Sequence, residues 1–197
     1  MRPPCLAVTL GDPAGIGPEI VASLLREGPP AGARLLIVGD RGVLALAAAE
    51  RGAPLLPPDV EGPEAMDAEN LDVALLASPR PLQPLPAPGH IAAEAGAACH
   101  AWVETAARLA LADRVDGIVT GPIHKEAWRR AGIESPGHTE ALRDLAGVER
   151  VLMLLVGGRL RAALATIHVA LRDVPDLLET TRMVGDLELL GRELEST

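Results

Sequence analysis

The sequence predicts an α/β fold in which helices cover the faces of a parallel sheet. Short aliphatic runs, typical of buried strands, alternate with helical patterns, and this order is typical of β-α-β units. The expected strands cover residues 6–10, 34–38 and 117–120, with a weaker candidate at 73–76. The expected helices cover residues 18–26, 41–50 and 91–113. A chain of 197 residues, 48% of them apolar, has room for one α/β domain, or for one domain and part of a second.

Local signals support the individual helices. Pro18 and Glu19 begin the first helix, because proline in the first turn followed by an acidic residue marks a helix start. Segments 52–63 and 79–89 are rich in proline and glycine, and we expect them to be loops. The longest expected helix has apolar residues that recur at spacings of three and four along one face, namely Ile91, Ala95, Cys99, Trp102, Ala106 and Leu109.

The C-terminal part of the chain has a different pattern. Two short helices are expected at 125–131 and 139–146. Residues 151–156 and 160–167 read as paired strands around a turn at Gly157 and Gly158. A last helix is expected over residues 175–194, and its apolar face is formed by Leu177, Val184, Leu187, Leu190 and Leu194.

The composition excludes several classes of protein. The formal net charge is −9 and Lys125 is the only lysine, so the basic face of a nucleic-acid-binding protein is missing. Trp102 and Trp128 are the only aromatic residues, which excludes a stacking platform for single-stranded nucleic acid. The core is therefore expected to consist of aliphatic side chains.

Cysteine usage and hydropathy add two expectations. Cys5 and Cys99 are not part of a CxxC motif, and we expect two buried free thiols. Residues 1–30 lack the pattern of a signal peptide, and no apolar run approaches the ~20 residues of a membrane span. We therefore expect a cytoplasmic protein with no membrane or nucleic-acid partner.

Three loop segments are candidate anion sites. Residues 11–19 (GDPAGIGPE) join a strand to a helix and could present backbone N–H groups, although the spacing fits neither GxGxxG nor a P-loop. Residues 120–125 (TGPIHK) follow a strand and place the ammonium of Lys125 where α/β sheets bind ligands. Residues 136–140 (PGHTE) begin a helix, so His138 could donate to a phosphate and Thr139 could cap the helix. A tight turn, a solvated lysine and a plain helix cap are the structural alternatives.

The fourth candidate is His168, in the segment ATIHVALRD. It follows the expected strand at 160–167 directly, so we expect it to project from the edge of a sheet into a cleft. A neutral imidazole there suits a divalent metal. Since a catalytic zinc commonly takes three protein ligands, one histidine makes no metal site, and spacing alone favours a structural role.

Four segments together resemble the 4-hydroxythreonine-4-phosphate dehydrogenases of vitamin B6 synthesis. They are VTLGDPAGIGPEI, VTGPIHK, AGIESPGHTE and LATIHVALRD, in this order and up to about residue 173. The resemblance implies the α/β/α architecture of the isocitrate and isopropylmalate dehydrogenases, incomplete at the C-terminus. Residues 1–120 are then a first α/β domain and residues 121–197 the beginning of a second. It also implies a homodimer.

The resemblance also implies the roles of the candidate residues. His138 and Thr139 contact a phosphorylated small-molecule substrate, and the position of Lys125 suits contact with the same phosphate. His168 is the first of three histidine ligands of a divalent cation, zinc, magnesium or cobalt. The implied reaction is oxidation of 4-phosphonooxy-threonine by NAD or NADP, followed by loss of carbon dioxide from the β-keto acid, in pyridoxal 5'-phosphate biosynthesis.

This chain departs from the family pattern in one respect. The family's second and third metal-binding histidines lie in NPHAGE-like and YHDQG-like segments, and neither segment occurs here. We therefore expect negligible dehydrogenase activity from this chain alone. The alternative is a non-catalytic remnant that binds a phosphorylated ligand or a partner chain.

Overall fold

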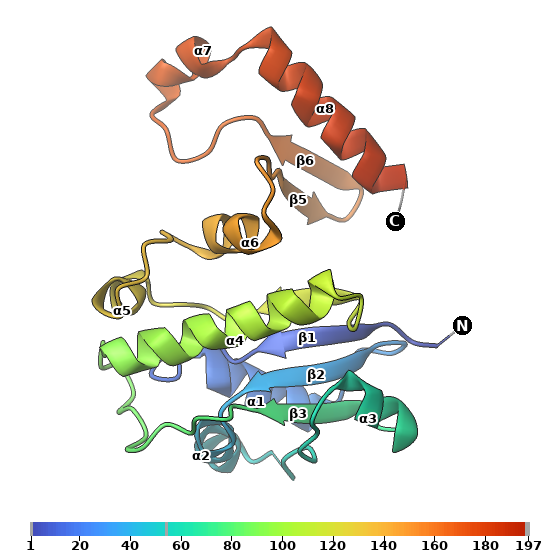
Figure 1. The fold of residues 1–197 in the computed structure, drawn as a ribbon, viewed down its shortest axis with the longest axis vertical. Helices are drawn as coiled ribbons and strands as arrows, with labels where there is room; N and C mark the ends of the chain where they lie inside the picture. Colours follow the sequence, from blue (N-terminus) through green and yellow to red (C-terminus); the bar gives the residue numbers. More distant parts are fainter. Residues whose placement is uncertain (1, 54, 196–197) are drawn as a thin grey trace. The chain divides into compact units, whose positions relative to one another are not determined.

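The computed structural model describes residues 2–53 and 55–195. The chain forms two compact units, Met1–Gly147 and Val148–Thr197. The first contains a four-stranded sheet and the second a two-stranded sheet (Figure 1). Within the described residues, no helix combines the length and the apolar character that crossing a bilayer requires.

The sheet of the first unit is parallel throughout, with the strand order β3-β2-β1-β4. Its strands are β1 (Cys5–Thr9), β2 (Arg34–Gly39), β3 (Val73–Ala77) and β4 (Gly117–Thr120). All four expected strands are confirmed, including the weak candidate that became β3. In the register, Thr9 at the end of β1 lies between Val38 of β2 and Thr120 of β4.

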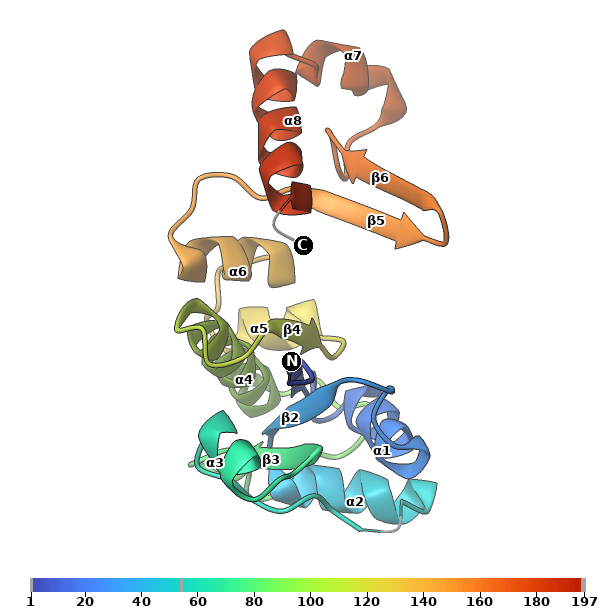
Figure 2. The ribbon, with the colours of Figure 1, turned by 90° about the vertical axis from the view of Figure 1, so that its right-hand side faces the viewer.

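Helices cover both faces of this sheet, as predicted. Figure 2 shows α1 on one side of the sheet and α4 on the other. The helices of the first unit are α1 (Gly17–Glu27), α2 (Arg41–Arg51), α3 (Pro63–Ala68), α4 (Ala93–Leu111), α5 (Lys125–Arg130) and α6 (His138–Ala146). The main core between sheet and helices is aliphatic apart from Trp102, Cys5 and Met66. Cys5 and Cys99 are buried free thiols, as expected, and burial raises the pKa of the Cys99 thiol to about 12.

Two expectations for the first unit were wrong. β4 is not a buried strand: it lies at the edge of the sheet, and Val119 is 47% exposed. An aliphatic run cannot distinguish a central strand from an edge strand, because strand order depends on distant pairings. The helix α3 was missed, although Pro63 and Glu64 in its first turn carry the same start signal as Pro18 and Glu19 in α1.

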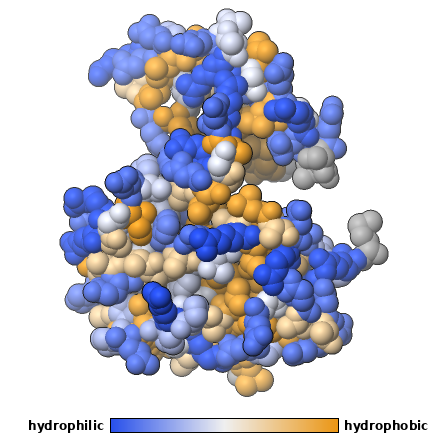
Figure 3. Space-filling model, in the orientation of Figure 1, coloured by the Kyte–Doolittle hydropathy of each residue, from blue (hydrophilic) through white to orange (hydrophobic). Residues whose placement is uncertain are grey.

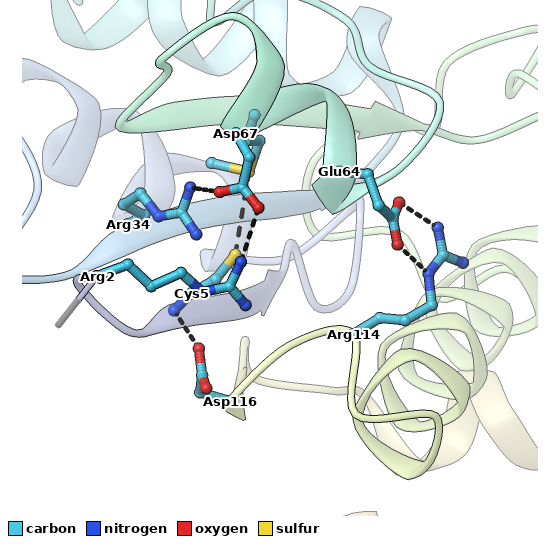
Figure 4. A network of polar contacts seen from close by, with 8 residues as sticks. Arg2, Cys5, Arg34, Glu64, Asp67, Arg114 and Asp116 are labelled. Carbon is cyan, nitrogen blue, oxygen red and sulfur yellow. Dashed lines mark hydrogen bonds and ion pairs between the residues drawn. The ribbon is translucent and has the colours of Figure 1, made fainter.

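An ion-pair network lies at the N-terminal ends of the strands (Figure 4). Arg34, at the start of β2, is buried and pairs with Asp67 of α3, whose other carboxylate oxygen accepts a hydrogen bond of 2.7 Å from Arg2. Beside it, two hydrogen bonds from Arg114 hold the pKa of the Glu64 carboxyl at about 2. The network ties α3 to the sheet at the amino ends of the strands, away from their carboxyl ends.

The second unit begins with the predicted hairpin. β5 (Met153–Gly157) and β6 (Leu160–Leu164) pair antiparallel, and Gly158 in the turn has φ +54°. The expected single helix over residues 175–194 is interrupted: a 3₁₀ turn (Leu171–Asp173) leads into α7 (Val174–Leu177), and α8 (Thr180–Glu195) follows. The break occurs at Leu178, whose backbone is extended.

The second unit has no buried residue among residues 148–195. Apolar side chains reach the surface between polar ones, as the upper part of Figure 3 shows for one face. The large exposed apolar residues of the unit are Val148, Val151, Leu155, Val156, Leu160, Val169, Leu171, Leu177, Leu178, Met183, Val184, Leu187 and Leu194. Such a surface is typical of an element that packs against something else.

Residues 121–147 belong to the first compact unit because α5 and α6 pack on α4. The contact between α4 and α5 depends on Gly96. A Cβ atom at this position would lie 2.1 Å from the carbonyl oxygen of Ala127 and 2.8 Å from the backbone nitrogen of Trp128. The domain division after residue 120 stays a prediction.

We predict that Gly96→Ala destabilises the first unit although alanine is the better helix former. The added methyl group cannot fit without moving α5, and overpacking of this kind costs about 1–3 kcal/mol. Gly191→Ala in α8 is the matched control, because open space surrounds Gly191 and the change should stabilise the helix by up to ~1 kcal/mol. Urea unfolding of both variants measures the difference, and equal stabilities would contradict the packing argument.

Candidate functional site

The strand order defines one position at which a ligand site is expected. From β1 the chain proceeds to β2 and β3 on one side, and it then returns to β4 on the other side of β1. The carboxyl ends of β1 and β4 therefore form a topological switch point, where open α/β sheets bind ligands. The GDPAGIG loop follows β1 and the TGPIHK loop follows β4, so the structure brings these two motifs together.

The two loops are joined through their backbones. The amide of Gly121 donates to both the carbonyl and the hydroxyl oxygen of Thr9, each at 3.1 Å, and the amide of Asp12 donates to the carbonyl of Pro122 at 2.8 Å. A Cβ atom on Gly11 would lie 2.5 Å from the Pro122 oxygen, and one on Gly121 would lie 2.6 Å from the Thr9 oxygen. Glycine at both positions is therefore required for the close approach.

Three of the six amides in the GDPAGIG loop have acceptors in the two loops, that of Asp12 in Pro122 and two others within the loop itself. The amides of Ala14 and Gly15 donate to the side chain and to the backbone oxygen of Asp12, each at 3.0 Å. Pro13 and Pro18 have no N–H group. This supports the structural alternative for the motif, a tight turn that fastens the β1 exit to the β4 exit, over an anion cradle.

The structure brings Lys125 beside the PGHTE segment. A Cβ atom at Gly137 would lie 3.9 Å from the Nζ atom of Lys125 and 3.4 Å from a carboxylate oxygen of Glu140. Lys125 is exposed, and it forms no ion pair with the residues that the structure describes. His124 precedes it and caps α5, because its Nδ1 atom accepts from the amide of Ala127 at 3.4 Å.

His138 is the first residue of α6 and is held against Trp128. The two rings meet edge to face, with their centroids 5.9 Å apart and their planes at 76°. Trp128 is 1% exposed and makes a second edge contact with His100 of α4, at 5.1 Å. The Nε2 atom of His138 is buried and has no hydrogen-bond partner in the described part of the chain. Burial lowers the pKa of the His138 imidazole, so the neutral form is favoured.

Thr139 does not cap α6, which corrects that expectation. The N-cap position is Gly137, and no side chain hydrogen-bonds the first turn. The helix begins one residue earlier than predicted, so Thr139 is already inside its first turn, half-buried. The first-turn amides of α6 thus have no side-chain acceptor, and its positive dipole end lies next to Lys125.

His168 lies in the second unit, in the loop that follows β6. The strand ends at Leu164 and not at residue 167, so His168 does not follow it directly. Its side chain is exposed and its backbone has φ +56°, which is unusual for a residue other than glycine. That His168 projects into a cleft stays a prediction.

The available side chains of the described residues do not suit a metal site. In residues 2–53 and 55–195, no three His, Cys, Asp or Glu side chains form a group that could hold a metal ion. His168 is thus a single imidazole, and the residues present do not make a metal centre by themselves.

Sequence reasoning missed three residues that shape the switch point: Thr9, Asp12 and Trp128. Thr9 and Asp12 are buried polar residues at the carboxyl end of β1. The signal was present, because a polar residue that ends an aliphatic strand must find a hydrogen-bond partner. No such signal exists for Trp128, whose contacts come from α4 and α6.

Comparison with known proteins agrees with this geometry. The family described as pyridoxal phosphate biosynthetic protein PdxA matches residues 31–197. The 4-hydroxythreonine-4-phosphate dehydrogenase of Geobacter metallireducens is 39% identical over 97% of this chain and 57% of its own length. The D-threonate 4-phosphate dehydrogenase of Bordetella bronchiseptica is 40% identical over 96% of this chain and 55% of its own length.

Solved structures agree with the computed fold. The 4-hydroxythreonine-4-phosphate dehydrogenase of Burkholderia phymatum superposes with a TM-score of 0.84 at 30% identity, over 95% of this chain and 57% of that one. The enzyme of Klebsiella pneumoniae gives 0.84 at 33% identity, over 98% and 58%. These relatives have the isocitrate and isopropylmalate dehydrogenase-like α/β fold, which confirms the expected fold class.

The chain spans a little over half the length of the curated relatives that it matches. Those relatives are named as dehydrogenases that act on four-carbon phosphate esters. Because the family match covers residues 31–197 and these relatives are 39% and 40% identical over nearly the whole chain, the chain belongs to the PdxA family.

Proposed function

We propose that this chain is part of an NAD- or NADP-dependent dehydrogenase that oxidises the phosphorylated hydroxy acid 4-phosphonooxy-threonine in pyridoxal 5'-phosphate synthesis. The observation that carries the proposal is that Lys125, which follows the loop after β4, stands beside Gly137 at the start of α6, whose first residue is His138, in a PdxA-family fold. The names of the two relatives support the substrate class, because 4-hydroxythreonine 4-phosphate and D-threonate 4-phosphate share a four-carbon acid with a terminal phosphate.

The phosphate is the part of the substrate that this chain is equipped to bind. Lys125 supplies a full positive charge without a competing ion pair among the described residues. The first turn of α6 supplies uncapped amides at the positive end of a nine-residue helix. We propose that His138, half-buried at the first position of α6, contacts the phosphate together with the hydroxyl of Thr139 in the same turn. These groups suit a phosphate monoester better than a carboxylate, since a phosphate offers three acceptor oxygens.

The chemical step needs groups that this chain does not complete. A bound NAD or NADP would supply the hydride acceptor for the carbon of the secondary alcohol, whose hydroxyl proton would leave to a base, and the resulting β-keto acid would lose carbon dioxide readily. A divalent cation (zinc, magnesium or cobalt) is expected in the family, and we propose His168 as one of its ligands. Because the described residues form no three-ligand cluster, the role proposed for this chain's own residues is to bind and orient the phosphate ester.

A second candidate function follows from the same observation. The groups proposed to bind the phosphate all lie within the compact unit Met1–Gly147. Among the residues that the structure describes, no cluster of side chains could hold a metal. The chain could therefore bind a phosphorylated ligand without turning it over, as a non-catalytic remnant would. Binding and turnover measured on the same preparation separate the two candidates.

We predict that the 197-residue chain binds 4-hydroxythreonine 4-phosphate without added metal and forms no NADH or NADPH. Calorimetry measures the binding and absorbance at the nicotinamide band measures the turnover. Lys125→Gln should weaken the affinity about tenfold, as expected for the loss of a charge-assisted hydrogen bond.

The matched control for this prediction is Arg129→Gln, on the same helix. Arg129 is exposed and already paired with Glu126 at 2.8 Å, so its loss should leave the affinity within about twofold. Equal losses in the two variants would show that only net charge matters. Rapid turnover by this chain would refute the expectation that it is inactive alone.

Because the neutral form of His138 is favoured in the folded chain, we predict that folding stability depends on pH even without a ligand. The pKa of His138 is lowered by burial in the folded chain, so the unfolded chain binds more protons as the pH falls through about 6.5. Folding stability should therefore be complete above that pH and should decrease below it. Urea unfolding at pH 7.5 and pH 5.5 measures the loss.

His138→Gln should lose less stability on acidification than the unmodified chain does. The control is His90→Gln, because His90 is exposed and lies in the loop before α4. If the acid loss is the same in the His138 variant and in the unmodified chain, the imidazole does not titrate as burial predicts.

We also propose that the protein is a homodimer, with the second unit as the interface. The support is the exposed apolar surface of the β5–β6 hairpin and α8, on which Leu187 is 64% exposed. We predict the mass of a dimer by light scattering, and a shift of Leu187→Asp toward the monomer mass of 20.5 kDa. Leu55→Asp is the control, since Leu55 is 83% exposed in the first unit. A monomeric unmodified chain would contradict the proposal.

A further inference from the structure

Thr9 is a fully buried hydroxyl at the end of an otherwise apolar strand. It is 0% exposed and is the last residue of β1. Burial of a hydroxyl is unfavourable unless it is hydrogen-bonded, and valine has nearly the same shape without this cost. The hydroxyl therefore needs a role that an aliphatic side chain could not fill.

Its contact is with the first residue after β4. The amide of Gly121 donates to the Thr9 hydroxyl at 3.1 Å, and it shares the same proton with the Thr9 carbonyl, also at 3.1 Å. The carbonyl alone could satisfy that amide, so the hydroxyl is a second acceptor. It fixes the direction in which the chain leaves β4, a four-residue strand that is paired only with β1.

The loop that begins at Gly121 leads directly to Lys125. Its start is held by Thr9, its second residue accepts a 2.8 Å hydrogen bond from the amide of Asp12, and the helix that follows rests on Gly96. These fixed points leave little freedom to the residues between them. The position of the Lys125 ammonium beside Gly137 thus depends on where the loop starts.

We infer that Thr9 is a positioning residue of the phosphate-binding site. Its buried hydroxyl fixes the exit of β4 and, through residues 121–124, the position of Lys125. The inference rests on the proposed function for the ligand, whereas the contact between Thr9 and Gly121 does not. The two parts can therefore fail separately.

The test compares Thr9→Val, which keeps the shape, with Thr9→Ser, which keeps the hydroxyl. Without ligand, Thr9→Val should accelerate hydrogen exchange of the Gly121 amide about 3- to 10-fold, the range expected for one hydrogen bond. Affinity for 4-hydroxythreonine 4-phosphate, measured by calorimetry, should fall by about the same factor. Thr9→Ser should restore both to within about twofold of the unmodified chain.

Thr105→Val is the matched control. Thr105 lies on α4, and its hydroxyl donates to the carbonyl of Ala101 within the same helix, at 2.8 Å. The same chemical change there should leave Gly121 exchange and ester affinity unchanged. An equal loss of affinity in the Thr105 and Thr9 variants would show a general effect of stability and would overturn the inference.

Two further outcomes decide the inference even if Thr9→Val does not fold. Exchange of Gly121 in the unmodified chain at the rate of an unprotected amide would overturn it, because the hydroxyl would then hold nothing. Slow exchange there and in Thr9→Ser, with faster exchange in Thr9→Ala, would support it, because the carbonyl acceptor is the same in all three chains. If the unmodified chain binds no ester, the proposed function fails, whereas Gly121 protection still decides whether Thr9 holds the loop.

Discussion

The backbone contact between the exits of β1 and β4 is the constraint on which the rest of the first unit depends. Two loops separated by more than a hundred residues meet through Gly11 and Gly121. Neither position tolerates a Cβ atom, and shared hydrogen bonds from Gly121 and Asp12 keep the loops together. The contact fastens the two loops together at the switch point and sets the direction of the chain toward α5. The position of the candidate site therefore follows from this contact between the two loops.

The packing of α5 and α6 on α4 completes the site. α4 lies across the sheet and carries α5 and α6 on its other side, which is possible because Gly96 lets the α5 backbone touch it. Trp128 fills the space between these helices and receives an imidazole edge from His100 and from His138. The result is a histidine whose neutral form is favoured, held against Trp128 near the exposed, charged Lys125. His138 and Lys125 thus contribute differently to binding a phosphate ester: the histidine is held in a fixed orientation and the lysine carries the charge.

The second unit contrasts with this well-packed arrangement. None of its described residues is buried, and its hairpin and α8 leave large aliphatic side chains in contact with solvent. His168 sits there in an exposed loop, at a left-handed backbone position that costs free energy unless a surrounding structure holds it. Both features fit the proposal that this unit packs against a second copy of the chain.

The sequence by itself determined the local structure. Aliphatic runs identified all four parallel strands, and the helix-start pair Pro18 and Glu19 located α1. Only the tertiary structure decided that β4 is an edge strand, that Thr139 lies inside its helix and that Lys125 stands beside Gly137. Strand and helix patterns are properties of neighbouring residues, whereas the edge position of β4 and the position of Lys125 depend on pairings between distant segments. Such pairings depend on close backbone contacts, and a glycine is the only sign of such a contact in the sequence.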